Sequence, residues 1–125
     1  TTMIENTSND ANVNLYDLKL VYEIAENNEE FVRTLLQIYL DTIPATSEEM
    51  LKEARANNWE TAGKLAHKLK STIDTMLIVS IQDDVRTVER CGKTQTDTHL
   101  MLPLSEKIDK VVNEVANQFK ANFQL

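Results

Sequence analysis

The sequence predicts an all-α protein, an antiparallel four-helix bundle with a short N-terminal helix that caps one end. The chain has 125 residues, the length of one ordinary domain. Its two Gly and two Pro are too few for an all-β fold, which needs a turn about every 8–12 residues. After a short leader, four amphipathic stretches follow one another with short connections, which is typical of a bundle whose neighbouring helices run in opposite directions.

The N-terminal part divides into an arm and a first helix. Residues 1–13 are rich in Asn, Thr, Ser and Asp and lack periodicity, so we expect a disordered arm or the end of a linker. Asn14 followed by Asp17 is typical of a helix N-cap with an acid in the first turn, which predicts a short helix over 15–25. The bundle domain is expected to span 14–125.

A long second helix is predicted over 28–56. Asn28 is a good N-cap, and Glu29 and Glu30 place negative charge at the positive end of the helix dipole. Pro44 removes one backbone hydrogen bond from the middle of the apolar stripe. This leaves two possibilities, a single kinked helix or two helices meeting just before the proline, and we favour the single helix.

The third helix begins at Trp59. Asn57 and Asn58 supply a stop and a new N-cap, and so short a loop makes the two helices antiparallel. The apolar residues then recur at steps of three and four: Ala62, Leu65, Ala66, Leu69, Ile73 and Met76. The pattern does not show how the helix joins the next one near Leu77.

The last two helices are predicted from Ile78 to about Arg90 and from 100 to 122. Cys91 and Gly92 are expected to end the first of them, with glycine as a left-handed cap. A polar loop follows over 93–98, and Pro103 suits the first turn of the final helix, where backbone donors are unpaired.

The charge is unevenly distributed. The net charge is −7 at pH 7, made up of −8 from residues 1–60 (4 basic, 12 acidic) and +1 from residues 61–125 (9 basic, 8 acidic). This balance argues against nucleic acid as a partner, since such binding requires Lys and Arg to neutralise phosphates. Lys64, Lys68 and Lys70 nevertheless surround His67, so an anion is best received there.

Several classes of protein are disfavoured. The apolar runs are too short for a membrane span and the N-terminus is polar, so we expect a soluble, unsecreted, cytoplasmic protein without direct membrane contact. Cys91 is the only cysteine, which favours a reducing compartment. A bundle metalloenzyme would carry Glu-x-x-His pairs, whereas Lys64 precedes His67 and Thr96 precedes His99 at that spacing. His99 is expected to be solvated.

His67 lies at the border of the apolar stripe of its helix. Its neighbours on the same helical face are Gly63, Lys70, Ser71 and Asp74, a polar strip with small residues beside the ring. We interpret the helical glycine as clearing space for a partner surface. Spacing alone leaves a second interpretation open, an ordinary solvated histidine among lysines.

The segment AHKLKST, residues 66–72, resembles the signature A-H-x-L-K-G-S of histidine-containing phosphotransfer (HPt) domains. The similarity extends over roughly 15–122, and both LYDLKLVYEIAENNEEFV and NNWETAGKLAHKLK resemble the form attached to hybrid sensor kinases. Two positions depart from the pattern: Ser71 replaces the usual Gly, and Leu77 stands where a second Gly often follows.

This resemblance implies a phosphorelay intermediate. His67 would accept a phosphoryl group from a phospho-Asp of a response-regulator receiver domain, by analogy through Nε2, and pass it to another receiver. The chain would have no kinase activity of its own, whether free-standing or part of a hybrid sensor kinase. It would bind no cofactor or metal, because the divalent ion belongs to the receiver, and it would be monomeric.

The resemblance also implies roles for the neighbours of His67. Lys70 would offset the charge of the phosphoryl group, Ser71 would donate a hydrogen bond to it, and Glu89 would orient the imidazole. The docking surface around the histidine would comprise Gly63, Lys64, Lys68 and Asp74. An alternative is an HPt-like bundle that docks receivers without carrying phosphate, which only the departures at Ser71 and Leu77 favour.

Overall fold

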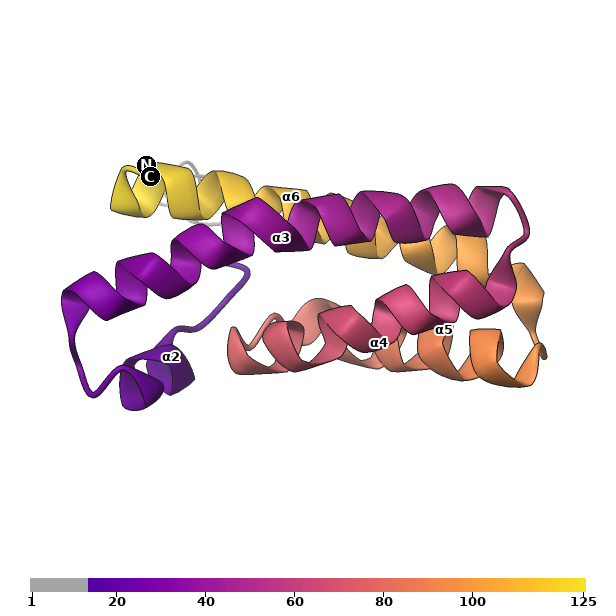
Figure 1. Ribbon diagram of the computed structural model, residues 1–125, viewed down its shortest axis with the longest axis horizontal. Coiled ribbons are helices and arrows are strands. Elements are labelled where there is room, and N and C mark those ends of the chain that lie inside the picture. The colour runs from indigo at the N-terminus through magenta and orange to yellow at the C-terminus, as the bar shows by residue number, and fades with distance from the viewer. Residues whose placement is uncertain (1–13) are drawn as a thin grey trace, which may run out of the picture.

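The computed structural model describes residues 14–125, and the predicted arm or linker end at 1–13 lies outside them. These residues form helices without any strand, so the all-α prediction is confirmed for 14–125 (Figure 1). The elements are α2 (Lys19–Ile24), α3 (Glu29–Arg55), α4 (Trp59–Thr75), the 3₁₀ turn η1 (Val79–Ile81), α5 (Gln82–Thr94), the 3₁₀ turn η2 (Thr98–Leu100) and α6 (Met101–Phe123).

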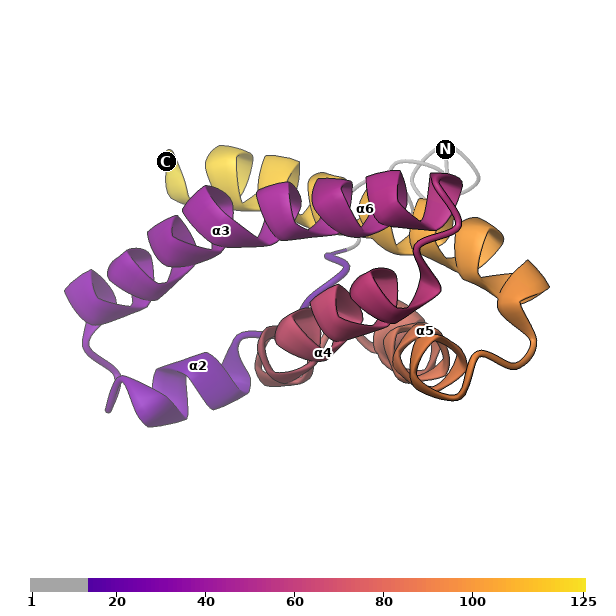
Figure 2. The ribbon, with the colours of Figure 1, turned by 45° about the vertical axis from the view of Figure 1, so that its right-hand side comes forward.

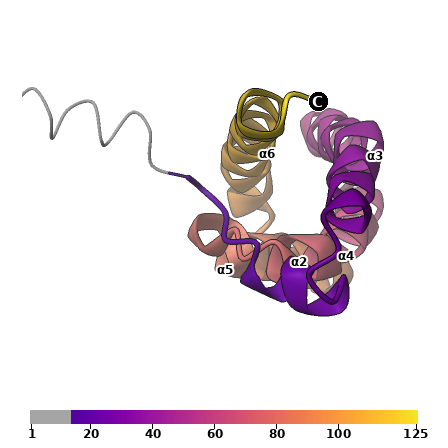
Figure 3. The ribbon, with the colours of Figure 1, turned by 90° about the vertical axis from the view of Figure 1, so that its left-hand side faces the viewer.

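The four long helices form an antiparallel bundle, as predicted. Seen along the long axis, α3, α4, α5 and α6 surround a common core (Figure 3). Each helix packs against the next one in the chain, and α6 returns to pack against α3. The short helix α2 lies at the end of the bundle where α4 finishes, on the side away from α6 (Figure 2).

The leader before α2 differs from the prediction. The expected N-cap at Asn14 is wrong, since α2 begins only at Lys19, whose backbone N–H donates to Oδ1 of Asp17 at 3.0 Å. Leu15 is held by α6 instead, since its N–H donates to the Gln118 side chain at 2.9 Å, and the N–H of Asp17 donates to the carbonyl of Met76 after α4 at 3.0 Å. These tertiary bonds compete with a local helix start, and the leader therefore crosses the end of the bundle.

The long helix α3 is continuous through Pro44, as favoured from the sequence. Its N-cap is also as predicted, because the side chain of Asn28 accepts from the N–H of Phe31 at 3.0 Å. At the other end Lys52 and Arg55 face the negative end of the dipole. The helix axis changes direction along its length (Figure 1), as expected where a proline interrupts the hydrogen-bond ladder.

The helices end at left-handed residues that are not glycine. Asn57 has φ 62° after α3, and Leu77 has φ 50° after α4, where the N–H of Ile78 returns to the carbonyl of Ile73 at 3.0 Å. The predicted glycine cap at Gly92 is wrong: α5 continues to Thr94, and Gln95 adopts the left-handed cap with φ 53°. Asn58 also differs from the prediction, since its side chain makes no cap and donates to Glu53.

The core orients the face of α4 that carries the histidine. Ala66 and Leu69 are fully buried among side chains from the other helices. Across the bundle, the hydroxyl of buried Tyr39 donates to the carbonyl of Val112 at 3.0 Å and joins α3 to α6. Because α4 is fixed by its buried stripe, residue 67 must face away from the core.

The exposed cap residue Gln95 offers a test of the turn geometry. A residue with a Cβ is strained at φ 53°, whereas glycine adopts this conformation readily. We therefore expect Gln95→Gly to stabilise the fold by about 0.5–1 kcal/mol, measured by urea unfolding. Gln95→Ala is the control without that freedom, and equal stability of the two variants would contradict the left-handed cap.

Candidate functional site

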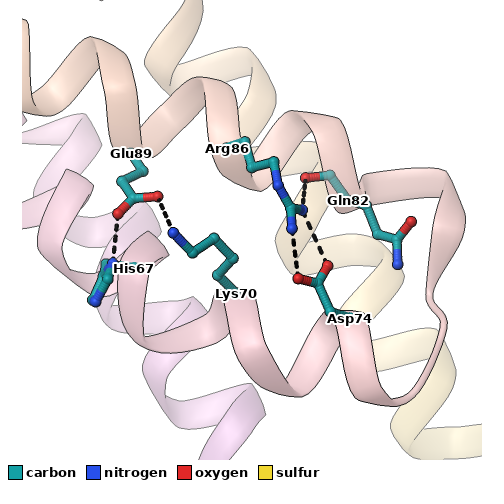
Figure 4. A network of polar contacts seen from close by, with 6 residues as sticks. All are labelled: His67, Lys70, Asp74, Gln82, Arg86 and Glu89. Atoms are coloured by element: carbon teal, nitrogen blue, oxygen red, sulfur yellow. Dashed lines mark hydrogen bonds and ion pairs between the residues drawn. The ribbon is translucent and has the colours of Figure 1, made fainter. Parts of the chain in front are cut away.

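His67 lies on the solvent side of α4. Its side chain is 65% exposed, although its neighbour Ala66 is fully buried. The ring is nevertheless held, because Nδ1 lies 2.5 Å from Oε2 of Glu89 on α5 (Figure 4). The contact expected between Glu89 and the imidazole is thus present in the structure.

Glu89 bridges two residues of α4. Its second oxygen, Oε1, accepts from Nζ of Lys70 at 2.9 Å, so one carboxylate holds both His67 and Lys70 (Figure 4). The side chains of Glu89 and Lys70 are only 26% and 31% exposed. We call this group of three side chains the imidazole network.

The protonation of the imidazole network follows from Glu89. The hydrogen bond from Lys70 lowers the pKa of Glu89 below its ordinary value of 4.5, against the opposing effect of burial, and His67 lowers it further. Glu89 is therefore a carboxylate at neutral pH, and a carboxylate can only accept hydrogen bonds. In the neutral ring the proton must then reside on Nδ1, which leaves the lone pair on Nε2.

A groove of about 430 Å³ lies beside the ring, between α4 and α5. It brings together most of the predicted site residues and adds Lys93 of α5, which the sequence analysis did not single out. The lining residues are Glu60, Gly63, Lys64, His67, Lys68, Glu89 and Lys93. Lys93 follows Glu89 by four residues on one helix, and this spacing was the signal available in the sequence.

The lysines around His67 are not equally free. Lys70 is held by Glu89, and Lys64 pairs with Glu60 at 3.3 Å. Lys68 and Lys93 are exposed and form no ion pair among residues 14–125. An anion in the groove therefore meets these two ammonium groups without displacing a partner.

Ser71 and Asp74 lie apart from the groove. Asp74 is engaged by Arg86 of α5 through two hydrogen bonds of 3.0 and 2.5 Å (Figure 4), a pairing the sequence analysis did not anticipate. Ser71 is exposed, makes no hydrogen bond within the part of the chain described, and borders a separate apolar cavity of about 170 Å³. That cavity lies between α2, α3 and α4, one turn further along from His67.

The structure gives Gly63 a different role from the expected one. It is buried against α5, and a Cβ there would lie 3.0 Å from Cα of Gly92 and 3.2 Å from the carbonyl oxygen of Glu89. The glycine therefore permits close approach of two helices. It does not clear an open surface for a partner, and that interpretation of the sequence is wrong.

Two further observations concern other kinds of site. Among residues 14–125, no three His, Cys, Asp or Glu side chains gather in a way that could hold a metal ion, and His99 is exposed on η2. Within the same residues, every helix is too short or too polar to cross a membrane.

The pairing of Glu89 with Lys70 predicts a pH effect. A carboxyl group with a lowered pKa stabilises the fold above its unfolded-state pKa, and this contribution is lost as the pH falls through the folded-state pKa. We expect Lys70→Met to raise the pKa of Glu89 back toward 4.5 and to reduce the stability lost between pH 7 and pH 3. Carboxyl ¹³C NMR titration and urea unfolding measure the two effects.

The matched control is Lys110→Met, which removes an exposed lysine from α6. This variant should leave the titration of Glu89 as in the parent. If Lys70→Met also leaves it unchanged, the ion pair of the imidazole network does not persist in solution.

Comparisons of the chain with protein-family models, with curated proteins and with solved structures gave no match.

Proposed function

We propose that this protein carries a phosphoryl group on Nε2 of His67, accepting it from the phospho-Asp of a receiver domain and passing it to another receiver. The observation that carries the proposal is the hydrogen bond from Nδ1 to the Glu89 carboxylate, in an exposed ring that belongs to the segment AHKLKST. The bond leaves the opposite nitrogen with a lone pair and open to a partner. The resemblance of that segment to HPt domains supplies the reaction.

The transfer needs little from this chain. The lone pair on Nε2 attacks phosphorus, an N–P bond forms, the P–O bond to the aspartyl carboxyl breaks, and the carboxylate of the receiver leaves. Such transfers pass through a loose transition state, so positioning and electrostatics supply most of the catalysis. Glu89 contributes to both, because it orients the ring and balances the positive charge that the imidazole acquires on attack.

The groove cations favour the phosphorylated product. Lys68 and Lys93 border the groove with free ammonium groups, and their field favours the negative charge of a phosphoryl group. Lys70 contributes differently from the expectation for an isolated lysine, because its ammonium is bonded to Glu89. It contributes by keeping that carboxylate ionised and in place.

An apolar patch near Ser71 suits the docking of a receiver. Ile24, Phe31 and Ile38 are large hydrophobic residues with exposed fractions of 58%, 44% and 51%, and Ile24 and Ile38 border the 170 Å³ cavity that Ser71 also lines. The patch belongs to α2 and α3, and the cavity that it borders is closed on its other side by Ser71 of α4, one turn from His67. A partner that brings an acidic pocket to His67 therefore extends naturally over this patch. Exposed apolar surface of this kind marks interaction sites.

We expect Ile38→Asp to weaken receiver binding by about tenfold or more, because it places a charge in the apolar contact. Asn117 is exposed on α6, so Asn117→Asp adds the same charge away from the patch, and this variant should bind the receiver as the parent does. Binding is measured by calorimetry. Equal weakening by both variants would point to net charge as the cause and remove the patch from the interface.

The proposed function is tested by incubating the protein with a receiver domain phosphorylated on its aspartate. Acid-labile, alkali-stable label on His67, located by mass spectrometry under alkaline conditions, is the expected result. Binding of the receiver without transfer of label would instead support the docking-only alternative. If no receiver of a panel binds the protein or transfers label to it, the result would contradict both the phosphorelay proposal and the docking-only alternative.

A further inference from the structure

The helices α4 and α5 touch backbone to backbone at two glycines. A Cβ at Gly92 would lie 2.5 Å from the carbonyl oxygen of Trp59 and 2.8 Å from Cα of Gly63. A Cβ at Gly63 would meet Cα of Gly92 at 3.0 Å. These neighbours are main-chain atoms, which no change of side-chain rotamer can move, so any larger residue must push the helices apart.

Backbone conformation does not explain the two glycines. Both lie inside helices, and neither has a positive φ. Glycine within a helix costs about 0.5–1 kcal/mol relative to alanine. The close approach of α4 and α5 is the feature that an alanine would disturb, more at Gly92, where a Cβ would meet main-chain atoms at 2.5 and 2.8 Å, than at Gly63, where the nearest lies at 3.0 Å.

The glycine contact lies one helical turn from the imidazole network. Gly63 precedes His67 by four residues, and Gly92 follows Glu89 by three on the antiparallel helix. The backbone of Glu89 is itself part of the contact, since its carbonyl oxygen would be 3.2 Å from a Cβ at Gly63. The separation of the helices at this point therefore sets the distance that the side chain of Glu89 has to span to reach Nδ1 of His67.

We infer that Gly63 and Gly92 are positioning residues for the imidazole of His67. Their contact holds α5 close enough for Glu89 to bond Nδ1, and thereby selects the ring tautomer with the lone pair on Nε2. The inference deepens the proposed function. It rests on that function only in taking Nε2 as the atom that accepts the phosphoryl group. Neither glycine touches the reacting atoms, and both act through the position of Glu89.

The test reads the tautomer directly and needs neither receiver nor phosphate. In the parent, ¹⁵N NMR of the neutral rings should show His67 with its proton on Nδ1, and the exposed His99 serves as an internal reference. In Gly63→Ala and in Gly92→Ala, His67 should show a mixture of tautomers, as a solvated ring does. If both alanine variants keep the proton on Nδ1, the inference is wrong.

Two controls separate positioning from loss of stability. Val112→Ala removes a buried methyl pair from α6 and should destabilise the fold without changing the tautomer of His67. In a Glu89→Ala background, Gly63→Ala should cause no further change in the tautomer, because its effect passes through Glu89. A tautomer shift in Val112→Ala would overturn the inference. So would an effect of Gly63→Ala in the Glu89→Ala background that is as large as its effect in the parent.

Glu89→Asp provides a test that introduces no Cβ between the helices. The aspartate is one methylene shorter, and α4 and α5 already touch at the glycines, so the helices cannot move closer to restore the bond. We expect His67 to lose its Nδ1–H preference in this variant. A retained preference would show that the glycine contact does not set the separation of the helices.

Discussion

Replacing His67 with Gln is expected to abolish acid-labile labelling from a phosphorylated receiver while leaving the fold as stable as in the parent. The amide of glutamine has no nucleophilic lone pair, so no N–P bond can form. The side chain is 65% exposed and fills no core space, and such surface substitutions usually change stability by less than about 0.5 kcal/mol. Label transfer and thermal unfolding measure the two halves of this prediction.

The matched variant is His99→Gln. His99 is exposed on η2 and lies apart from the groove, so its removal should leave labelling at the parental level. Label that persists in His67→Gln and disappears in His99→Gln would move the phosphoryl site to residue 99. Label that persists in both would exclude histidine as the acceptor.

The helices could be predicted because each is stabilised by an apolar face whose residues recur at steps of three and four along the chain. The stripe through Ala66, Leu69 and Ile73 is buried as the spacing indicates, and Asn28 caps α3 through a local bond to Phe31. The predicted helix ends were wrong where contacts with residues distant in the sequence determine the end of a helix. The leader is held by α6, and Gly92 lies inside α5 because α4 packs against it.

The sequence pattern relates the site residues along one helix, and across two helices only the contact of Glu89 with His67 was expected, from the resemblance to HPt domains. Helical geometry alone relates His67 to Lys70, Ser71 and Asp74. Which residue of α5 meets each of them depends on the register between α4 and α5, which no local pattern encodes. The structure pairs Glu89 with His67 and Lys70, and it pairs Arg86 with Asp74.

This difference changes how charge is interpreted around His67. In the sequence, Lys70 is the lysine nearest to His67 on the same face of the helix. In the structure Lys70 neutralises Glu89, and the unpaired ammonium groups of the groove belong to Lys68 and Lys93. Salt should therefore weaken the attraction of an anion to the exposed pair more than it weakens the partly buried contact of Lys70 with Glu89.

The largest loss of stability is expected from Phe119→Ala. Phe119 is fully buried in α6, and its ring packs edge-on against Tyr16 of the leader and Tyr39 of α3, with centroids 4.6 and 5.0 Å away. Truncation removes these contacts and leaves a cavity among three segments of the chain, which costs about 3–5 kcal/mol. A domain of this size has about 5–15 kcal/mol in all, so the variant should lose a large fraction of its free energy of unfolding, measured by urea unfolding.

The comparison for that prediction is Phe123→Ala. Phe123 lies one turn further along α6, is partly exposed, and meets the ring of Phe119 at a centroid distance of 6.4 Å. Truncating Phe123 leaves a smaller cavity, so Phe123→Ala should lower the free energy of unfolding in urea clearly less than Phe119→Ala does. Because α6 is not part of the groove, folded Phe119→Ala should retain the His67 tautomer of the parent. Equal losses from the two variants would mean that this cluster of rings does not anchor the leader and α3 to α6.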